Sequence, residues 1–116
     1  TVIGLATSIQ LVSLRATRTG GEVSVAWETA SEANTLGYRI YRSATADRAA
    51  ATLVSDGVIA ATGQTTGASY TWADPAAPSE PAFYWLEEIE TNGTLTEYGP
   101  AMVGGMFRGY LPAIGR

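Results

Sequence analysis

The stretch from Glu22 to Ser43 constrains the fold of this chain more than any other, because apolar and polar residues alternate on both sides of a short polar segment. Its alternating apolar positions are Val23, Val25 and Trp27, and then Tyr38 and Ile40. A period of two places one face of an extended strand against an apolar core. The stretch therefore predicts two antiparallel strands, joined by a loop, at the centre of a β-sandwich.

Further segments continue the alternation along the chain. The additional candidate strands are Ile9 to Thr17, a short strand near Thr52–Ser55, Ala68 to Asp74, Phe83 to Thr91 and Leu95 to Val103. The rest of the alanine-rich stretch before Ala68 is expected to be an irregular connection. Asn92-Gly93 is a strong two-residue hairpin signal between the last two of them. We expect about seven strands, whose core residues are Val23, Val25, Trp27, Tyr38, Ile40, Tyr70, Trp72 and Leu86.

The run from Trp27 to Ser43 reads W-E-T-A-S-E-A-N-T-L-G-Y-R-I-Y-R-S. It resembles a run of the fibronectin type III-like (immunoglobulin-like) domains of secreted bacterial proteins. The family's later pattern of Tyr, Leu-Glu, Gly and Tyr-Gly-Pro is matched by Tyr84, Leu86-Glu87, Gly93 and Tyr98-Gly99-Pro100. Ala82 stands where the family usually has an additional Tyr. The resemblance covers about Ile9 to Val103 and implies a fibronectin type III-like antiparallel sandwich.

Two apolar segments flank this domain, so the expected organisation is an extension at 1–8, a domain at 9–103 and a tail at 104–116. The first segment either lengthens the first strand on its own sheet or pairs with a neighbouring molecule. The tail contains F-R-x-Y-L-P, which is similar to short endings of secreted proteins that carry this domain. The candidate subunit-interface residues are Val2, Ile3, Leu5, Phe107, Tyr110 and Leu111.

Composition excludes several classes of function. The net charge of −4 argues against nucleic-acid binding, which requires a clustered basic surface. The absence of Cys and His removes thiol nucleophiles, His-dependent relays and most transition-metal sites. Glu87 and Glu88 are adjacent on one strand and face opposite sides, so we expect a solvated sheet face there and no catalytic pair. We expect no enzyme activity, no metal, no cofactor and no membrane span.

Aromatic residues raise the alternative of carbohydrate binding. Trp27, Tyr38 and Trp72 fit the core pattern, whereas Trp85 and Tyr41 have the opposite parity and are expected on outer sheet faces. One or two outward rings make only a small platform for a sugar. Asn92-Gly93-Thr94 is formally an acceptor for N-linked glycosylation, although the hairpin explains it.

The leading functional hypothesis is a structural subunit of an extracellular filament, in which copies of this chain join by exchange of a terminal strand. Two apolar segments beside a complete sandwich favour it, and the extension at 1–8 is preferred as donor over the tail. The alternative is a passive accessory or adhesive module of a larger secreted protein. Both hypotheses place the chain outside the cell or on its surface.

Overall fold

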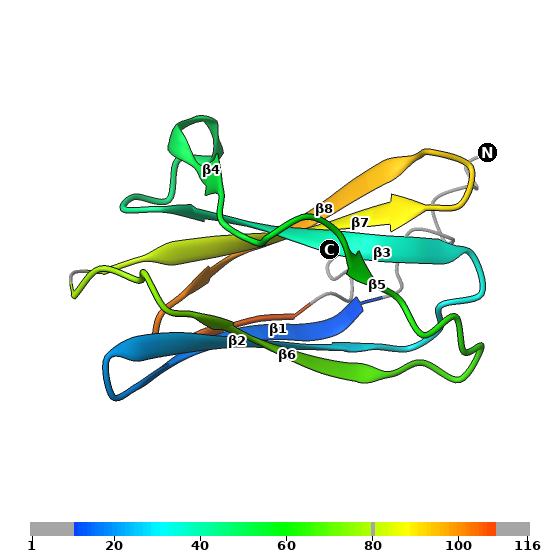
Figure 1. Cartoon of the computed structure of the whole chain (residues 1–116), viewed down its shortest axis with the longest axis horizontal. Helices are drawn as coiled ribbons and strands as arrows, with labels where there is room; N and C mark the ends of the chain where they lie inside the picture. Colours follow the sequence, from blue (N-terminus) through cyan, green and yellow to red (C-terminus); the bar gives the residue numbers. More distant parts are fainter. Residues whose placement is uncertain (1–10, 80, 109–116) are drawn as a thin grey trace, which may run out of the picture.

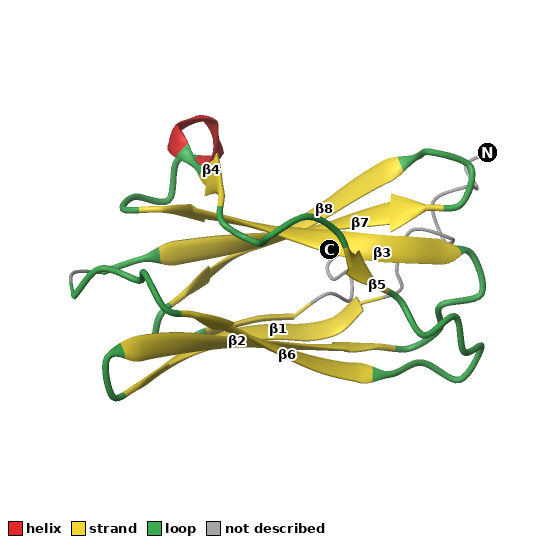
Figure 2. Cartoon of the chain, in the orientation of Figure 1, coloured by secondary structure: helices red, strands yellow, loops and turns green. Residues whose placement is uncertain are grey.

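Two β-sheets face each other in the computed structural model of this chain, which describes residues 11–79 and 81–108 (Figure 1 and Figure 2). The described residues form nine strands and one 3-10 helix, with no α-helix among them. In chain order these are β1 (Leu11–Thr19), β2 (Glu22–Thr29), β3 (Thr35–Ser43), η2 (Arg48–Ala50), β4 (Thr52–Leu53), β5 (Ile59–Ala60), β6 (Ser69–Asp74), β7 (Phe83–Glu90), β8 (Leu95–Met102) and β9 (Met106–Arg108).

The first sheet has the strand order β6-β2-β1-β9, and the second has β4-β3-β7-β8 with β5 also paired to β3. Every pair of named strands is antiparallel. The prediction of an all-β antiparallel sandwich is confirmed. The described residues contain nine strands where the sequence predicts about seven, because β5 and β9 are short additions of two and three residues. The short strand expected near Thr52–Ser55 is β4.

Three aromatic rings from three strands meet in the core. Trp27 and Tyr70 stack with ring centroids 5.1 Å apart, and Tyr38 meets both rings edge-on at 5.5 and 5.2 Å. Such pairs contribute about 0.5–1.5 kcal/mol beyond the burial of their area. Of the eight expected core residues, the fully buried ones are Val23, Val25, Trp27, Tyr38, Ile40 and Leu86, and the partly buried ones are Tyr70 and Trp72.

The alanine-rich connection between β3 and β6 contains β4, β5 and the single helical turn η2, and is otherwise irregular. Val54 and Ser55 in this connection hydrogen-bond to β3, as residues of a longer edge strand would. Val54 and Ser55 both donate their backbone N–H groups to the carbonyl of Ile40, at 2.9 and 3.3 Å. The Ser55 hydroxyl in turn accepts from the Ile40 N–H at 3.0 Å. The middle of β3 is therefore hydrogen-bonded on both sides.

The last part of the described chain lies beside β1, the strand with which the described chain begins. Val103 forms a parallel bridge with Ala16, and β9 then runs back antiparallel to β1. Phe107 on β9 is opposite Leu14 and is half-buried against the core of its own domain. The other candidate interface residues, Val2, Ile3, Leu5, Tyr110 and Leu111, lie outside the described residues. No helix in the described ranges is long and apolar enough to span a membrane.

Candidate functional site

Glu88 on β7 faces the core, although the sequence predicts a solvated position. Its side chain is buried and accepts hydrogen bonds from the Thr35 hydroxyl at 2.6 Å and the Tyr98 hydroxyl at 3.0 Å. Burial raises the pKa of Glu88 above its ordinary value, and the nearby carboxylates of Glu90 and Glu32 act in the same direction. The expectation of solvent exposure is wrong here because the polar partners of Glu88 come from β3 and β8, which lie on either side of it.

Glu87 points to the outer face of the same sheet, so the predicted separation of the two carboxylates is correct. It is buried all the same. The Tyr41 hydroxyl donates to Glu87 at 3.2 Å, and the Arg39 guanidinium lies 3.4 Å from it. Arg48 pairs with Glu97, the residue opposite Glu87 on β8, at 2.8 Å. Two arginines thus balance two glutamates across three strands.

Trp85 is buried although it lies on the outer face, and Arg48 contacts residues of the strands on either side of it. The Arg48 guanidinium lies 4.1 Å from the centre of the Tyr41 ring on β3 and bonds to Glu97 on β8, so it lies over β7 between them. Trp85 lies on β7 opposite Tyr41 and is only 4% exposed. The sequence places Tyr41 and Trp85 on the correct side of the sheet, but Trp85 is buried and the Arg48 guanidinium covers one face of the Tyr41 ring.

Glu32 is the main polar residue of the core that sequence reasoning missed. It lies in the loop after β2 and has no exposed surface. Its carboxylate accepts from the hydroxyls of Tyr38 at 2.6 Å, Tyr70 at 2.5 Å and Thr62 at 2.6 Å. Burial opposes its ionisation most strongly, but these bonds and one from the Gly63 N–H together hold the pKa of Glu32 below its ordinary value.

Three distant parts of the chain therefore meet on one buried carboxylate. Thr62 is 30 residues and Tyr70 is 38 residues from Glu32 along the chain. A buried charge that accepts several hydrogen bonds is costly to break and fixes the segments around it. The one sequence signal was the Glu of the W-E-T-A-S-E run, which carried the family resemblance. All its acceptor positions are used internally, so Glu32 acts as a structural anchor.

Asp74 is the second buried carboxylate anchor, at the end of β6. Arg42 donates to it at 2.6 Å and the Tyr84 hydroxyl at 2.7 Å. Burial and this hydrogen bond raise the pKa of Tyr84. Tyr84 thus connects β7 to the end of β6 through its side chain, while Ala82 is a buried apolar residue.

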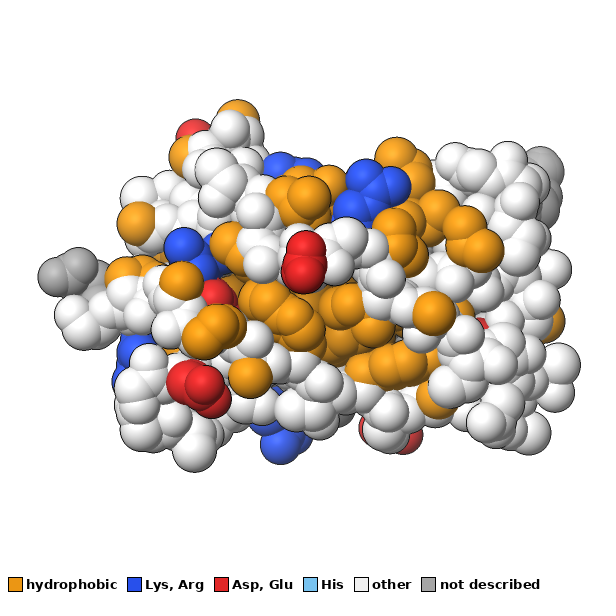
Figure 3. All heavy atoms as spheres, viewed as in Figure 1, with side chains coloured by type: hydrophobic (Ala, Val, Ile, Leu, Met, Phe, Trp, Pro, Cys, Tyr) orange, Lys and Arg blue, Asp and Glu red, His pale blue; other side chains and the backbone are white. Residues whose placement is uncertain are grey.

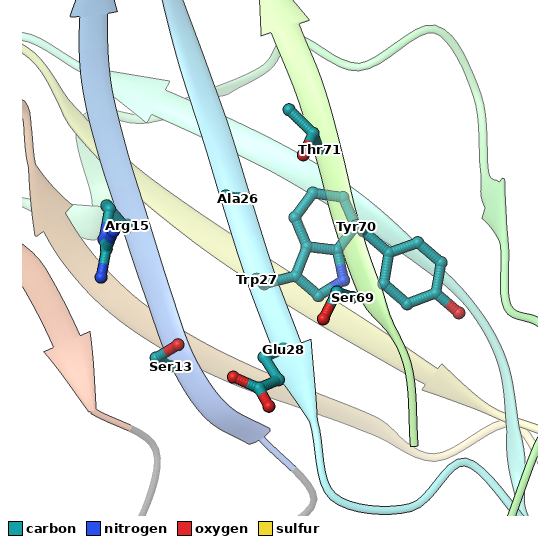
Figure 4. Close-up of a pocket in the computed structure, with 8 residues that line it drawn as sticks. All are labelled: Ser13, Arg15, Ala26, Trp27, Glu28, Ser69, Tyr70 and Thr71. Carbon is teal, nitrogen blue, oxygen red and sulfur yellow. The ribbon is translucent and has the colours of Figure 1, made fainter. Parts of the chain in front are cut away.

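The outer face of the first sheet has a polar hollow of about 220 Å³ (Figure 4). Its lining residues are Ser13, Arg15, Ala26, Trp27, Glu28, Ser69, Tyr70 and Thr71. The rings of Trp27 and Tyr70 are stacked on each other and offer it no free platform. The hollow lacks the paired acid and base, or the aromatic face, that catalysis or sugar binding would use.

Two further expectations from the sequence concern metal ligands and Asn92. The described ranges contain no cluster of three or more metal-ligating side chains. Asn92 is exposed in the β7–β8 loop, and its side-chain oxygen accepts from the Thr94 N–H at 2.9 Å, which fits the predicted turn. Glycosylation of Asn92 remains a prediction.

Comparison with known proteins finds similarity at the level of fold alone. No family model matches the chain, and no curated protein sequence matches it significantly. Two crystal structures of pectate lyase Pel3 from Pectobacterium carotovorum superpose with TM-scores of 0.64 and 0.63 at 16% and 17% identity. Pectate lyase PelI from Erwinia chrysanthemi, solved with tetragalacturonic acid, superposes with a TM-score of 0.64 at 16% identity.

The extent of these matches differs strongly between the two partners. They cover 78%, 90% and 82% of this chain but only 26%, 28% and 28% of the lyase chains. This chain therefore spans about a quarter of the length of the lyases. At this identity the similarity supports the fold and carries no residue of a lyase site into this chain.

Proposed function

We propose that this chain is a passive, fibronectin type III-like accessory module of a larger secreted protein, and that it is not itself an enzyme. The observation that carries the proposal is the coverage: most of this sandwich matches about a quarter of each lyase chain. A comparable sandwich thus recurs as a minor part of larger chains. The site geometry agrees, because Glu32, Asp74 and Glu88 are buried and hydrogen-bonded internally.

The test is the size and behaviour of the natural protein. An antibody raised against the purified domain should detect, in the secreted fraction, a polypeptide much longer than 116 residues. The purified domain alone should be a monomer and should not cleave polygalacturonate, whereas a pectate lyase assayed in parallel should. Cleavage that survives repurification, or a secreted species that contains only this domain, would contradict the proposal.

A second candidate is the extracellular filament joined by strand exchange. It is favoured by β6, which is an edge strand of the first sheet and pairs only with β2 in the described chain. In Figure 3 hydrophobic side chains form a band between the two sheets on this side of the molecule. Partly buried Val54, Ile59 on β5 and Trp72 on β6 pack against the core. An added strand could pair with β6 and cover them.

The edge strand β8 of the second sheet is a poorer acceptor of an added strand than β6. The pairing of β8 with β7 shifts between Tyr84 and Leu86, and Pro100 on β8 has no N–H to donate. Deletion of residues 1–8 should therefore convert threads into folded monomers if this extension is the donor strand. Electron microscopy of the full chain, showing threads or single particles, decides between this candidate and the accessory module.

A further inference from the structure

Asn92 and Gly93 form the only Asn-Gly step of the sequence, and both lie exposed in the turn between β7 and β8. Two backbone hydrogen bonds hold this turn. The Gly93 N–H donates to the carbonyl of Glu90 at 2.9 Å, and the Glu90 N–H donates to the carbonyl of Thr94 at 2.8 Å. A Cβ placed on Gly93 would meet nothing within 4 Å. The peptide bond that follows Asn92 is therefore open to solvent and carries no shielding side chain.

The side chain of Asn92 folds back over this peptide bond. Its Oδ1 atom accepts from the Thr94 N–H at 2.9 Å, which closes a turn that contains both the Asn92 Cγ atom and the Gly93 nitrogen. The same N–H withdraws electron density from Cγ, as a donor of an oxyanion hole does. Within the described part of the chain, the Asn92 Nδ2 atom has no hydrogen-bond acceptor that would retain it.

We propose that Asn92 is a site of spontaneous deamidation in the folded protein, with water as the co-reactant. The exposed bond between Gly93 and Glu90 opens transiently, and the Gly93 amide loses its proton to hydroxide. Its nitrogen then forms a bond to Cγ of Asn92, the Cγ–Nδ2 bond breaks, and Nδ2 takes a proton from water and leaves as ammonia. The product is a five-membered succinimide ring.

Hydrolysis of the succinimide completes the modification. Water that opens the ring at Cγ gives an aspartyl residue, and water that opens it at the main-chain carbonyl of residue 92 gives an isoaspartyl residue. Nothing is oxidised or reduced in either step. Both products add one negative charge to the net charge of −4 and remove the nitrogen that an N-linked glycan at Asn92 would use. The isoaspartyl product also lengthens the backbone by one carbon in the turn that joins β7 to β8.

Asn34, the other asparagine of the sequence, is an internal comparison. It is followed by Thr35, a buried β-branched residue at the start of β3. The Thr35 N–H donates to the carbonyl of Glu32 at 3.1 Å, and its hydroxyl donates to Glu88 at 2.6 Å. The nitrogen that would attack Asn34 is thus shielded by a side chain that is fixed in the core, and Asn34 should not react.

Peptide mapping of the purified, folded chain tests the proposal, which is independent of the proposed function. During incubation at mildly alkaline pH, the peptide that contains Asn92 should acquire the mass of an acid in place of an amide, and faster as the pH rises. Ammonia should be released in equal amount, and an isoaspartyl methyltransferase should label part of the product. The peptide that contains Asn34 should keep its mass.

Two variants separate the chemistry from the glycosylation sequon. Gly93→Ala should deamidate at least about tenfold more slowly, because its methyl group hinders the attack; this ratio corresponds to about 1.4 kcal/mol in the barrier. Thr94→Ala is the matched control, since it destroys the sequon but keeps the N–H that binds Oδ1, and its rate should be unchanged. Circular dichroism should show that both variants are folded.

Three results would overturn the proposal. An Asn92 that stays intact in the folded chain but reacts in urea would show that the turn protects it. Equal conversion of Asn34 and Asn92 would show that the turn has no part in the reaction. An unchanged rate in Gly93→Ala would exclude attack by the Gly93 nitrogen.

Discussion

Tyr38 donates its hydroxyl hydrogen to Glu32 at 2.6 Å, inside a core where neither side chain has more than 1% of its surface exposed. The same tyrosine packs its ring against Trp27 and Tyr70. One residue thus joins the aromatic cluster to the buried carboxylate, and the loop after β2 is fixed to the centre of the sandwich.

Replacement of Tyr38 by Phe should therefore be costly although the ring is kept. It leaves the buried carboxylate one hydrogen bond short, and bonds to charged groups contribute about 1.5–3 kcal/mol. We expect a decrease of that size in the free energy of unfolding, measured with urea. Tyr41→Phe is the control, and it should cost less than Tyr38→Phe because its hydrogen bond to Glu87 is longer, at 3.2 Å, and only partly buried on the outer face.

Glu32 and Glu88, two of the buried glutamates, should give opposite dependences of stability on pH. The pKa of Glu32 is lowered by folding, so its contribution is present above the ordinary value and is lost as the pH falls through the folded pKa. The pKa of Glu88 is raised, so its contribution is present below the ordinary value and is lost as the pH rises through the folded pKa.

Substitution separates these two contributions. Glu88→Gln keeps an oxygen that can accept from Thr35 and Tyr98, and it should abolish the loss of stability that occurs as the pH rises from the ordinary value of 4.5. Glu32→Gln should abolish the loss at more acidic pH. Urea midpoints measured at several pH values report both slopes. Identical slopes in the two variants would rule out this assignment.

A side chain should be more destabilising at Gly67 than at Gly93. Both have a positive φ, of 87° and 92°. A Cβ on Gly67 would lie 2.2 Å from the carbonyl oxygen of Thr29, while a Cβ on Gly93 meets nothing within 4 Å. The difference between Gly67→Ala and Gly93→Ala in the free energy of unfolding reports the steric overlap apart from the backbone strain they share, and should be about 1–3 kcal/mol.

Trp27→Ala should remove the centre of the core. The side chain is 2% exposed and contacts two other rings, so its loss should cost about 3–5 kcal/mol. Calorimetry should show a large decrease in melting temperature. Trp72→Ala is the comparison, since Trp72 is only partly buried and should cost less.

The sequence predicted those features that depend on the local alternation of apolar and polar residues. The alternation around Trp27 and Tyr38 identified two central strands, their inward faces and the antiparallel sandwich. The faces of Glu87 and Glu88 also followed from parity. Burial of outward residues did not, because the partners of Tyr41 and Glu97 on the outer face include Arg48, which lies in the single helical turn η2 of a connection that no period describes.

The buried carboxylates Glu32 and Asp74 could not be predicted from the sequence for a related reason. Glu32 lies in a polar loop whose composition is typical of exposed turns, and its partners Thr62 and Tyr70 are far away in sequence. Nothing in a local window shows that three hydroxyl groups converge there. Such a buried carboxylate is visible only when the strands that carry its donors are already in place.

The pairing of β9 with β1 has a mechanical consequence. Arg108 lies opposite Ser13, so the chain enters at Leu11 and leaves at Arg108 side by side at one pole of the sandwich. Because both ends of the described domain lie at the same pole, such a domain adds little to the distance between the two segments that flank it. Tension on both segments would break the hydrogen bonds between β1 and β9 one after another. It would not load all of these bonds together in shear.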